Sequence, residues 1–479
     1  MSVFTDLKRS GWIFPTVLLS LYGFFANCRP AEPFLTPYLI GPKNLSEQTV
    51  TNYLFPIWTY SYLSVLPVVF LLTDLLRYKP VVVLQGLFLV SNYLLLCFAH
   101  NLTAMTFLQF NYGVVTSTEV AYFSYIYSVI PPEHYQRATG FVRSAMLTGS
   151  TFGATLGQLL ISLAGVSYFT VNAITLGLMG TAFIVSFFLP MPQQGVFFGP
   201  TAVGVSADPL EERPGVTDPG VIGGQKAEAK ARWFSRESLR LAGRRMWANI
   251  KESYSSRRLV YWSVWWAFAT AHYSQIFNYI QLIWDRIEPS STSSVYNGGV
   301  EAVCTLVGAA AAFSVGYMRV RWEVWGEFSL GVFSAVGAAS VFFISLTTNI
   351  WISYSGYVIF KASYMFLITI ATFQIAANLS MECYALTFGI NTFMAIAIQT
   401  ILTAIIVDDT ALGLDIVTQF IIYGGCYGAL SVLFLLRGLY IACTHYCSSR
   451  SETETETGET TQHIDTPQTA GAEGLSTKM

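Results

Sequence analysis

Long apolar runs separated by short polar stretches dominate the hydrophobic pattern of this chain. A helix that crosses a lipid bilayer needs about 20 predominantly apolar residues. Twelve runs of about this length are predicted to span the membrane, at 11–28, 54–75, 80–99, 104–130, 140–164, 167–190, 259–283, 296–317, 325–346, 350–377, 385–407 and 416–443. The pattern therefore predicts an all-α membrane protein.

A polar segment divides these runs into two sets of six. We predict an N-terminal six-helix half over 1–190, a cytoplasmic central loop over 191–258 and a C-terminal six-helix half over 259–445. The remainder, 446–479, is polar and acidic and is predicted to be a disordered cytoplasmic tail. Two halves of six helices around a polar loop resemble the plan of major-facilitator transporters.

The central loop carries basic and aromatic residues together over 232–247. This pattern is typical of an amphipathic helix lying on the inner membrane surface. A partly helical, solvated linker fits the same residues, so the sequence leaves both interpretations open.

Basic residues predict how the chain is oriented. Cytoplasmic loops of membrane proteins are enriched in Lys and Arg, and 22 of the 26 basic residues lie on one side if both termini are cytoplasmic. The sequon Asn44-Leu45-Ser46 then falls in the first outer loop. We therefore predict N-glycosylation at Asn44.

Composition supports the membrane assignment and excludes several other classes. Of 479 residues, 53% are hydrophobic and only 11% are charged, against about 25% charged in soluble proteins. The net charge of −2, with no basic domain, argues against nucleic-acid binding. The seven cysteines show no metal-like spacing, and no HExxH motif or Ser/His/Asp grouping indicates an intramembrane enzyme. No cofactor is expected.

Polar residues inside the apolar runs indicate a functional cavity, because charges within a membrane are costly. Glu32, Glu119 and Glu301 are the main candidates, and Lys361 is the only basic residue predicted well inside a span and a candidate partner for one of them. On the fourth run a polar stripe has helical spacing, so its members share one face: Gln109, Tyr112, Thr116, Glu119 and Tyr122. Further polar candidates are Asn278 in the seventh run and Asn297, one turn before Glu301.

The end of the first run adds a further signal. Pro30 and Pro33 flank Glu32 and interrupt the helix, and Trp58 lies at a similar depth in the second run. Trp58 fits either a substrate site or the aromatic belt at the membrane interface. Carboxylates and aromatic rings together suit a flat organic cation.

Several stretches resemble solute carrier family 19, the reduced folate and thiamine carriers. They are RPAEPFLTPYL at 29–39, WTYSYL at 58–63, TDLLRYKP at 73–80, YNGGVEA at 296–302 and ATFQIAAN at 371–378. Folate carriers have an arginine where this chain has Glu119 and a lysine where it has Gln399. At both positions this chain lacks the basic residue of the folate carriers, and in this respect it is similar to the thiamine branch of the family.

The resemblance implies a thiamine pocket. Trp58 and Tyr112 would sandwich the aminopyrimidine ring, Asn278 and Glu301 would bond its polar edge, and Glu32 would complete the pocket. Two departures bear on selectivity, because thiamine carriers usually have a glutamate where this chain has Gln109 and one of them has a tyrosine where it has Ser150.

The resemblance also implies a transport mechanism. The chain would import thiamine through the plasma membrane by alternating access, in a pH-dependent, proton-coupled process, with pyridoxine and other organic cations as further substrates. We expect a monomer. Transport of reduced folate or another organic anion is the alternative, and a receptor that binds a vitamin without moving it fits the sequence as well.

Overall fold

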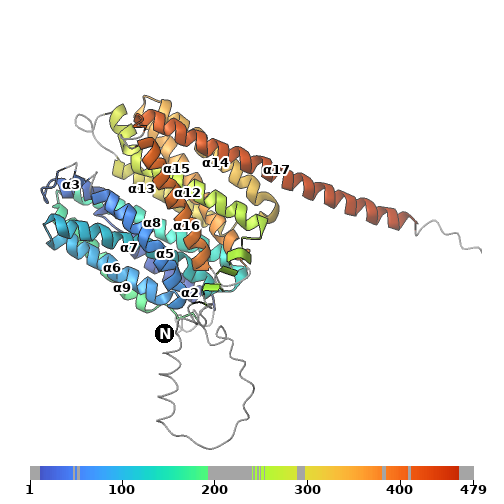
Figure 1. Ribbon diagram of the computed structural model, residues 1–479, viewed down its shortest axis with the longest axis horizontal. Helices are drawn as coiled ribbons and strands as arrows, with labels where there is room; N and C mark the ends of the chain where they lie inside the picture. The colour runs from blue at the N-terminus through green and yellow to red at the C-terminus, as the bar shows by residue number, and fades with distance from the viewer. Residues whose placement is uncertain are drawn as a thin grey trace, which may run out of the picture.

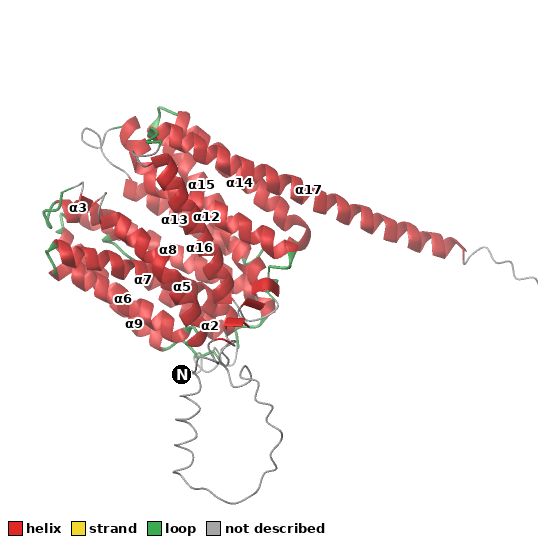
Figure 2. Cartoon of the chain, in the orientation of Figure 1, coloured by secondary structure: helices red, strands yellow, loops and turns green. Residues whose placement is uncertain are grey.

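The computed structural model describes three stretches of the chain. These are residues 11–192 except 47, 48 and 51–53, residues 240–288 except 241, 242, 245, 246, 249 and 253, and residues 297–462 except 380–383 and 408–411. Within them the regular secondary structure is entirely helical (Figure 2). The main helices are α2 (Ile13–Asn27), α3 (Leu35–Ile40), α5 (Phe55–Leu75), α6 (Lys79–Phe98), α7 (Leu102–Tyr125), α8 (Tyr135–Ser162), α9 (Tyr168–Phe187), α12 (Arg257–Ile287), α13 (Asn297–Val315), α14 (Trp322–Leu346), α15 (Ile350–Ala377), α16 (Tyr384–Leu402) and α17 (Ile416–Gln462).

Each predicted apolar run contains one of the longer helices, so the all-α prediction is confirmed. Among the described residues, seven helices are both long enough and apolar enough to cross a membrane: α6, α9, α13, α14, α15, α16 with the π-helical turn Thr403–Val407, and α17. Polar residues lower the hydropathy of others such as α8, which carries Arg143 and several Gly, Ser and Thr residues. The number of spanning helices therefore stays a prediction.

The break after the first helix follows from its prolines. α2 ends at Asn27, and a 3₁₀ turn over Glu32–Phe34 precedes α3. Proline has no backbone N–H, and its ring clashes with the preceding turn, so it favours a break in an α-helix. The interrupted segment that the sequence predicts is therefore confirmed.

The helices pack as two groups that meet along an interface formed chiefly by α8 and α13 (Figure 1). In the first group α7 packs on α5 and α6, and α2 packs on α8 and α9; in the second, α14 packs on α15 and α17, and α12 packs on α15 and α16. Across the groups, α8 contacts α13 and α15, while α16 contacts α5 and α7. These cross-group contacts surround the predicted site.

An aromatic cluster closes one end of the bundle, the end at which α9 finishes and α12 begins, here called the connector end. The hydroxyls of Tyr135 and Tyr384 lie 2.7 Å apart and join α8 to α16. Tyr127, Phe388 and Trp266 extend the cluster, with ring centroids 5.5 Å apart for Tyr127–Tyr384 and 5.4 Å apart for Trp266–Phe388. All five side chains are buried.

The C-terminal segment differs from the sequence prediction over its first part. Disorder is expected from residue 446, but α17 continues as a helix to Gln462 and extends beyond the bundle (Figure 1). No proline interrupts this stretch, so nothing in the backbone forces the helix to stop. Residues 463–479, and most of the predicted surface helix over 232–247, lie outside the described residues.

Candidate substrate-binding site

A hydrogen-bonded triangle links the end of α2 to the middle of α7. Arg29 donates from Nη1 to the Tyr112 hydroxyl at 2.8 Å, and that hydroxyl donates to Oε1 of Glu32 at 2.8 Å. Arg29 and Glu32 also form an ion pair at 3.3 Å. The Arg29 side chain is 6% exposed, whereas that of Glu32 is 49% exposed. The carboxylate is therefore held in place and still accessible.

Small residues on α8 allow this segment to come close. A Cβ atom at Gly153 would lie 2.5 Å from the backbone nitrogen of Arg29, and one at Gly149 or Gly157 would overlap the carbonyl of Phe24 or Pro30. These glycines are four residues apart, so they form one small-residue face of the helix. The face sets the position of Arg29 and of the turn that carries Glu32.

Trp58 joins the triangle through its ring. The indole Nε1 donates to the Thr116 hydroxyl at 3.3 Å, and the ring centroid lies 6.2 Å from that of Tyr112, with 38° between the planes. A flat molecule between two rings needs centroids about 7 Å apart, twice the carbon–carbon contact distance of about 3.5 Å. The two rings therefore contact each other here and must separate to admit a third. We call Arg29, Glu32, Trp58 and Tyr112 the N-terminal cluster.

The rest of the polar face of α7 also points into the protein. Gln109 is only 4% exposed and Glu119 is half-buried. Among the described residues Glu119 has no hydrogen bond or ion pair, but it lies in the electrostatic field of Arg29 and Arg143. The Arg143 guanidinium lies 4.6 Å from the centre of the Phe123 ring and donates to Thr372 on α15 at 3.4 Å.

A second charged cluster lies on the C-terminal group of helices. Glu301 of α13 forms an ion pair with Lys361 of α15, which is 2% exposed. The Lys361 ammonium lies 5.2 Å from the centre of the Phe277 ring, and Phe277 stacks on Tyr273 at 6.2 Å. We call Glu301, Lys361, Tyr273 and Phe277 the C-terminal cluster. No hydrogen bond or ring contact in the described part of the chain joins it to the N-terminal cluster.

The remaining predicted site residues lie outside both clusters. Asn278 is exposed on α12 and makes no hydrogen bond to any described residue. Asn297 begins α13, but its side chain is outside the described residues. Asn44 is exposed in the loop after α3, with a positive φ of 54°, and its glycosylation stays a prediction.

Two buried cations beside the predicted site residues were missed by the sequence analysis. Lys361 is not alone inside the bundle, because Arg29 and Arg143 are each 7% exposed. Arg29 was assigned to an outer segment because it lies just beyond the end of the first apolar run, and Arg143 to an inner segment because it lies near the start of the fifth run. A usable signal was the spacing of Arg29 three residues before Glu32, which suits an ion pair across a helical turn.

Comparison with known proteins decides the family. The profile described as reduced folate carrier matches residues 10–422 of this chain. The chain belongs to that family. Reduced folate carrier family members and their relatives are membrane transporters and not enzymes.

The most informative relatives divide into two kinds of carrier. The chain is 46% identical to thiamine transporter 2 of Homo sapiens over the full length of both, and 49% identical to human thiamine transporter 1 over 90% of each chain. Identity to the human reduced folate transporter is 39%, over 92% of this chain and 74% of that one.

Solved structures confirm the fold of this family member. The human organic anion transporter MFSD10 (TETRAN) aligns with a TM-score of 0.57 over 89% of this chain and 97% of its own, at 13% identity. A variant of the Escherichia coli fucose:proton symporter FucP aligns with a TM-score of 0.59 over 89% of this chain and 99% of its own, at 11% identity. The chain therefore shares the overall helical fold of these transporters, as expected from the sequence, while the division into two halves of six helices stays a prediction.

Proposed function

We propose that this reduced folate carrier family member imports thiamine across the plasma membrane, with both termini in the cytoplasm. The two relatives named thiamine transporters are 46% and 49% identical to it, and the relative named for reduced folate is 39% identical. Thiamine joins a flat aminopyrimidine to a positively charged thiazolium ring, so its binding calls for aromatic faces and negative charge.

The observation that carries this proposal is the contact between Trp58 and Tyr112 beside an accessible carboxylate. Their ring centroids are 6.2 Å apart, and the Tyr112 hydroxyl is bonded to Glu32. A small outward movement of either ring opens a slot for an aromatic ring, and Glu32 then faces the positive end of the ligand. Asn278, Asn297 and Glu301 would bond the polar edge from the other group of helices.

Internal cations tune the charge that such a ligand meets. Arg29 balances Glu32 and Lys361 balances Glu301, so Glu119 is the acid that no described side chain neutralises by direct contact. Glu119 would attract a cationic substrate electrostatically at long range. The same substrate would compete with Lys361 for the carboxylate of Glu301. Gln109, which is neutral, adds no further attraction.

The contacts between the two groups of helices support transport by alternating access. Tyr135 and Tyr384 join the groups at the connector end, whereas Glu32 and Glu301, at the other end, remain partly exposed. If the connector end is cytoplasmic, as the basic residues predict, this arrangement faces outward. The halves 1–190 and 259–445 would then rock around the site, as a monomer.

Proton coupling and a wider substrate range complete the proposal. Glu32, Glu119 and Glu301 are the candidates to carry a proton, since they are the acids of the site. Pyridoxine and other flat organic cations fit the same aromatic pair.

Transport of reduced folate or another organic anion is the second candidate. It is favoured by three buried cations near the predicted site residues, Arg29, Arg143 and Lys361, which are suited to carboxylates. Against it stands Glu119, whose negative charge lies in the field of two of those cations.

Uptake of labelled thiamine by cells expressing the chain tests the proposal. Saturable uptake that excess reduced folate does not inhibit is the expected result, and competition by pyridoxine measures the substrate range. Inhibition by folate, with no thiamine uptake by a protein that reaches the surface, would favour the anion carrier. Thiamine binding without flux in proteoliposomes would instead identify a receptor.

A further inference from the structure

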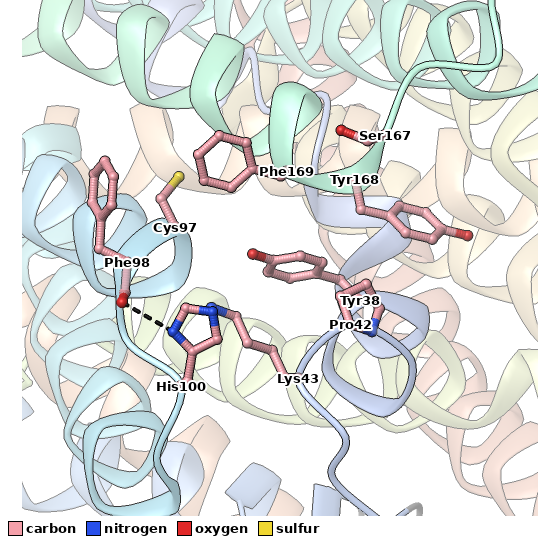
Figure 3. Close-up of a pocket in the computed structure, with 9 residues that line it drawn as sticks. All are labelled: Tyr38, Pro42, Lys43, Cys97, Phe98, His100, Ser167, Tyr168 and Phe169. Carbon is pink, nitrogen blue, oxygen red and sulfur yellow. Dashed lines mark hydrogen bonds between the residues drawn. The ribbon is translucent and has the colours of Figure 1, made fainter.

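A cavity of about 450 Å³ lies away from both charged clusters, at the end of the bundle opposite the connector end. Figure 3 shows how three segments surround it: the turn after α3, the end of α6 and the start of α9. Its lining combines aromatic rings with a few polar groups, namely Tyr38, Pro42, Lys43, Cys97, Phe98, His100, Ser167, Tyr168 and Phe169.

Lys43 is the unusual member of this lining. The residue is 5% exposed, and its ammonium donates to the carbonyl of Ala99 at 2.5 Å and lies 5.2 Å from the centre of the Tyr38 ring. An ammonium has three donors, yet among the described residues no carboxylate lies within ion-pair distance of it. Burial accordingly lowers the pKa of Lys43 below its ordinary value.

No carboxylate in the described part of the chain offsets the cost of burying this charge, and a bound anion would reduce that cost. The surroundings of Lys43 favour an anion further. α9 has 20 residues and begins at the cavity, with Ser167 as its N-cap. The positive end of its helix dipole therefore lies at the cavity. Lys43 and this helix end together make one region of positive potential inside the cavity.

The rim of the cavity indicates where the anion comes from. Phe98 and Phe169 are 67% and 47% exposed, and their rings meet edge to face at 6.3 Å between centroids. A phenylalanine ring carries no polar atom, so an exposed ring on a membrane protein is more stable against lipid than against water. The cavity therefore opens beside lipid, and its volume exceeds what a single small ion would fill.

We propose that this cavity binds the phosphate-bearing headgroup of a membrane phospholipid, with Lys43 as the counter-ion of the phosphate. Tyr38 and Phe169 would contact the glycerol and the first methylene groups. Such a lipid would tie the turn after α3 to α6 and α9, all within the N-terminal group of helices. The proposal concerns a site separate from the substrate clusters and does not depend on the identity of the substrate.

Native mass spectrometry of the full-length protein tests this proposal. The protein in detergent is titrated with phosphatidylcholine or with galactosyl diacylglycerol, which has a similar apolar part but no phosphate. We expect Lys43→Met to lower the affinity for phosphatidylcholine at least tenfold and to leave that for the galactolipid unchanged. Lys43→Arg, which keeps the charge, should retain binding.

Lys79→Met is the matched control. Lys79 also donates to a single helix-end carbonyl, that of Phe187 at 2.8 Å, but it does not line the cavity. The Lys79→Met variant should bind both lipids as the unaltered protein does. Equal phosphatidylcholine binding by Lys43→Met and the unaltered protein, or equal effects of Lys43→Met and Lys79→Met, would overturn the proposal.

Inorganic phosphate distinguishes a headgroup from a free anion. In lipid-depleted protein, millimolar phosphate should neither raise the thermal unfolding midpoint nor displace bound phosphatidylcholine. If phosphate does both, and Lys43→Met abolishes both effects, the cavity is a site for a soluble anion and the lipid assignment is wrong.

Discussion

Tyr112 and Glu32 are joined by a hydrogen bond of 2.8 Å although 80 positions separate them in the sequence. The same hydroxyl accepts a hydrogen bond from Arg29, so one oxygen atom orients both members of an ion pair. Tyr112 therefore contacts the other members of the N-terminal cluster in two ways: its hydroxyl bonds Arg29 and Glu32, and its ring lies against Trp58.

Tyr112→Phe separates these two roles, because it removes the hydroxyl and keeps the ring. A hydrogen bond to a charged group contributes about 1.5–3 kcal/mol, and about 1.4 kcal/mol corresponds to tenfold in affinity. We expect the KM for thiamine uptake to rise about tenfold, with surface expression unchanged. Tyr60→Phe, at a 62% exposed position on α5, is the control and should leave the KM unaltered. A KM within twofold of normal for Tyr112→Phe would show that the hydroxyl does not orient the site.

Apolar length predicted the helices because it is a local property that needs no knowledge of packing. The polar face of α7 was likewise readable from its spacing. The sequence predicted that Lys361 pairs with one of the acids, but not that the partner is Glu301, since only packing brings together residues 60 positions apart. Arg29 and Arg143 were missed for a related reason: a charge at or near the end of an apolar run is expected to be solvated, and only packing shows that a neighbouring helix covers it. The relation of Asn278 to either cluster stays a prediction.

The Glu301–Lys361 pair gives a prediction about stability. Removing one partner of a buried ion pair leaves an uncompensated charge and costs about 3–5 kcal/mol. We expect Glu301→Gln, which leaves the buried Lys361 unpaired, to lower the free energy of unfolding in detergent by about this amount, and Lys361→Met, which leaves a carboxylate that is 31% exposed, to lower it less. The double variant should lose less free energy of unfolding than the two single variants lose together, because neither charge remains.

An exposed ion pair provides the comparison for this double-mutant cycle. Arg286 and Asp415 lie 3.5 Å apart, but both side chains are more than half exposed. Solvent screening makes such pairs weak, so Arg286→Gln should leave the unfolding midpoint unchanged. Strict additivity of the Glu301 and Lys361 substitutions would mean that the two side chains do not interact in the folded protein.

The double variant Glu119→Arg with Gln399→Lys tests whether the carrier selects a cationic or an anionic substrate. These changes introduce the two cations that folate carriers have at the same positions. The first of them would place a guanidinium in the field of Arg29 and Arg143, with which Glu119 now interacts favourably. We expect thiamine uptake to be abolished at normal surface expression. Glu133→Arg makes the same charge change at an exposed position and should transport normally. Thiamine uptake that survives the double change would contradict the cation assignment.

Gly153 tests whether the small-residue face of α8 positions the N-terminal cluster. A Cβ there would lie 2.5 Å from the backbone nitrogen of Arg29 and 3.1 Å from the carbonyl carbon of Cys28, so Gly153→Ala must push this segment away. Overpacking of this kind costs about 1–3 kcal/mol. We expect a lower unfolding midpoint and, because Arg29 moves relative to Tyr112, a raised KM for thiamine. Gly177→Ala on α9, where no atom lies within 4 Å of the added carbon, should be neutral or stabilising, since alanine favours a helix by about 1 kcal/mol over glycine. If Gly153→Ala behaved like Gly177→Ala in both measurements, α8 would not determine where Arg29 and Glu32 lie.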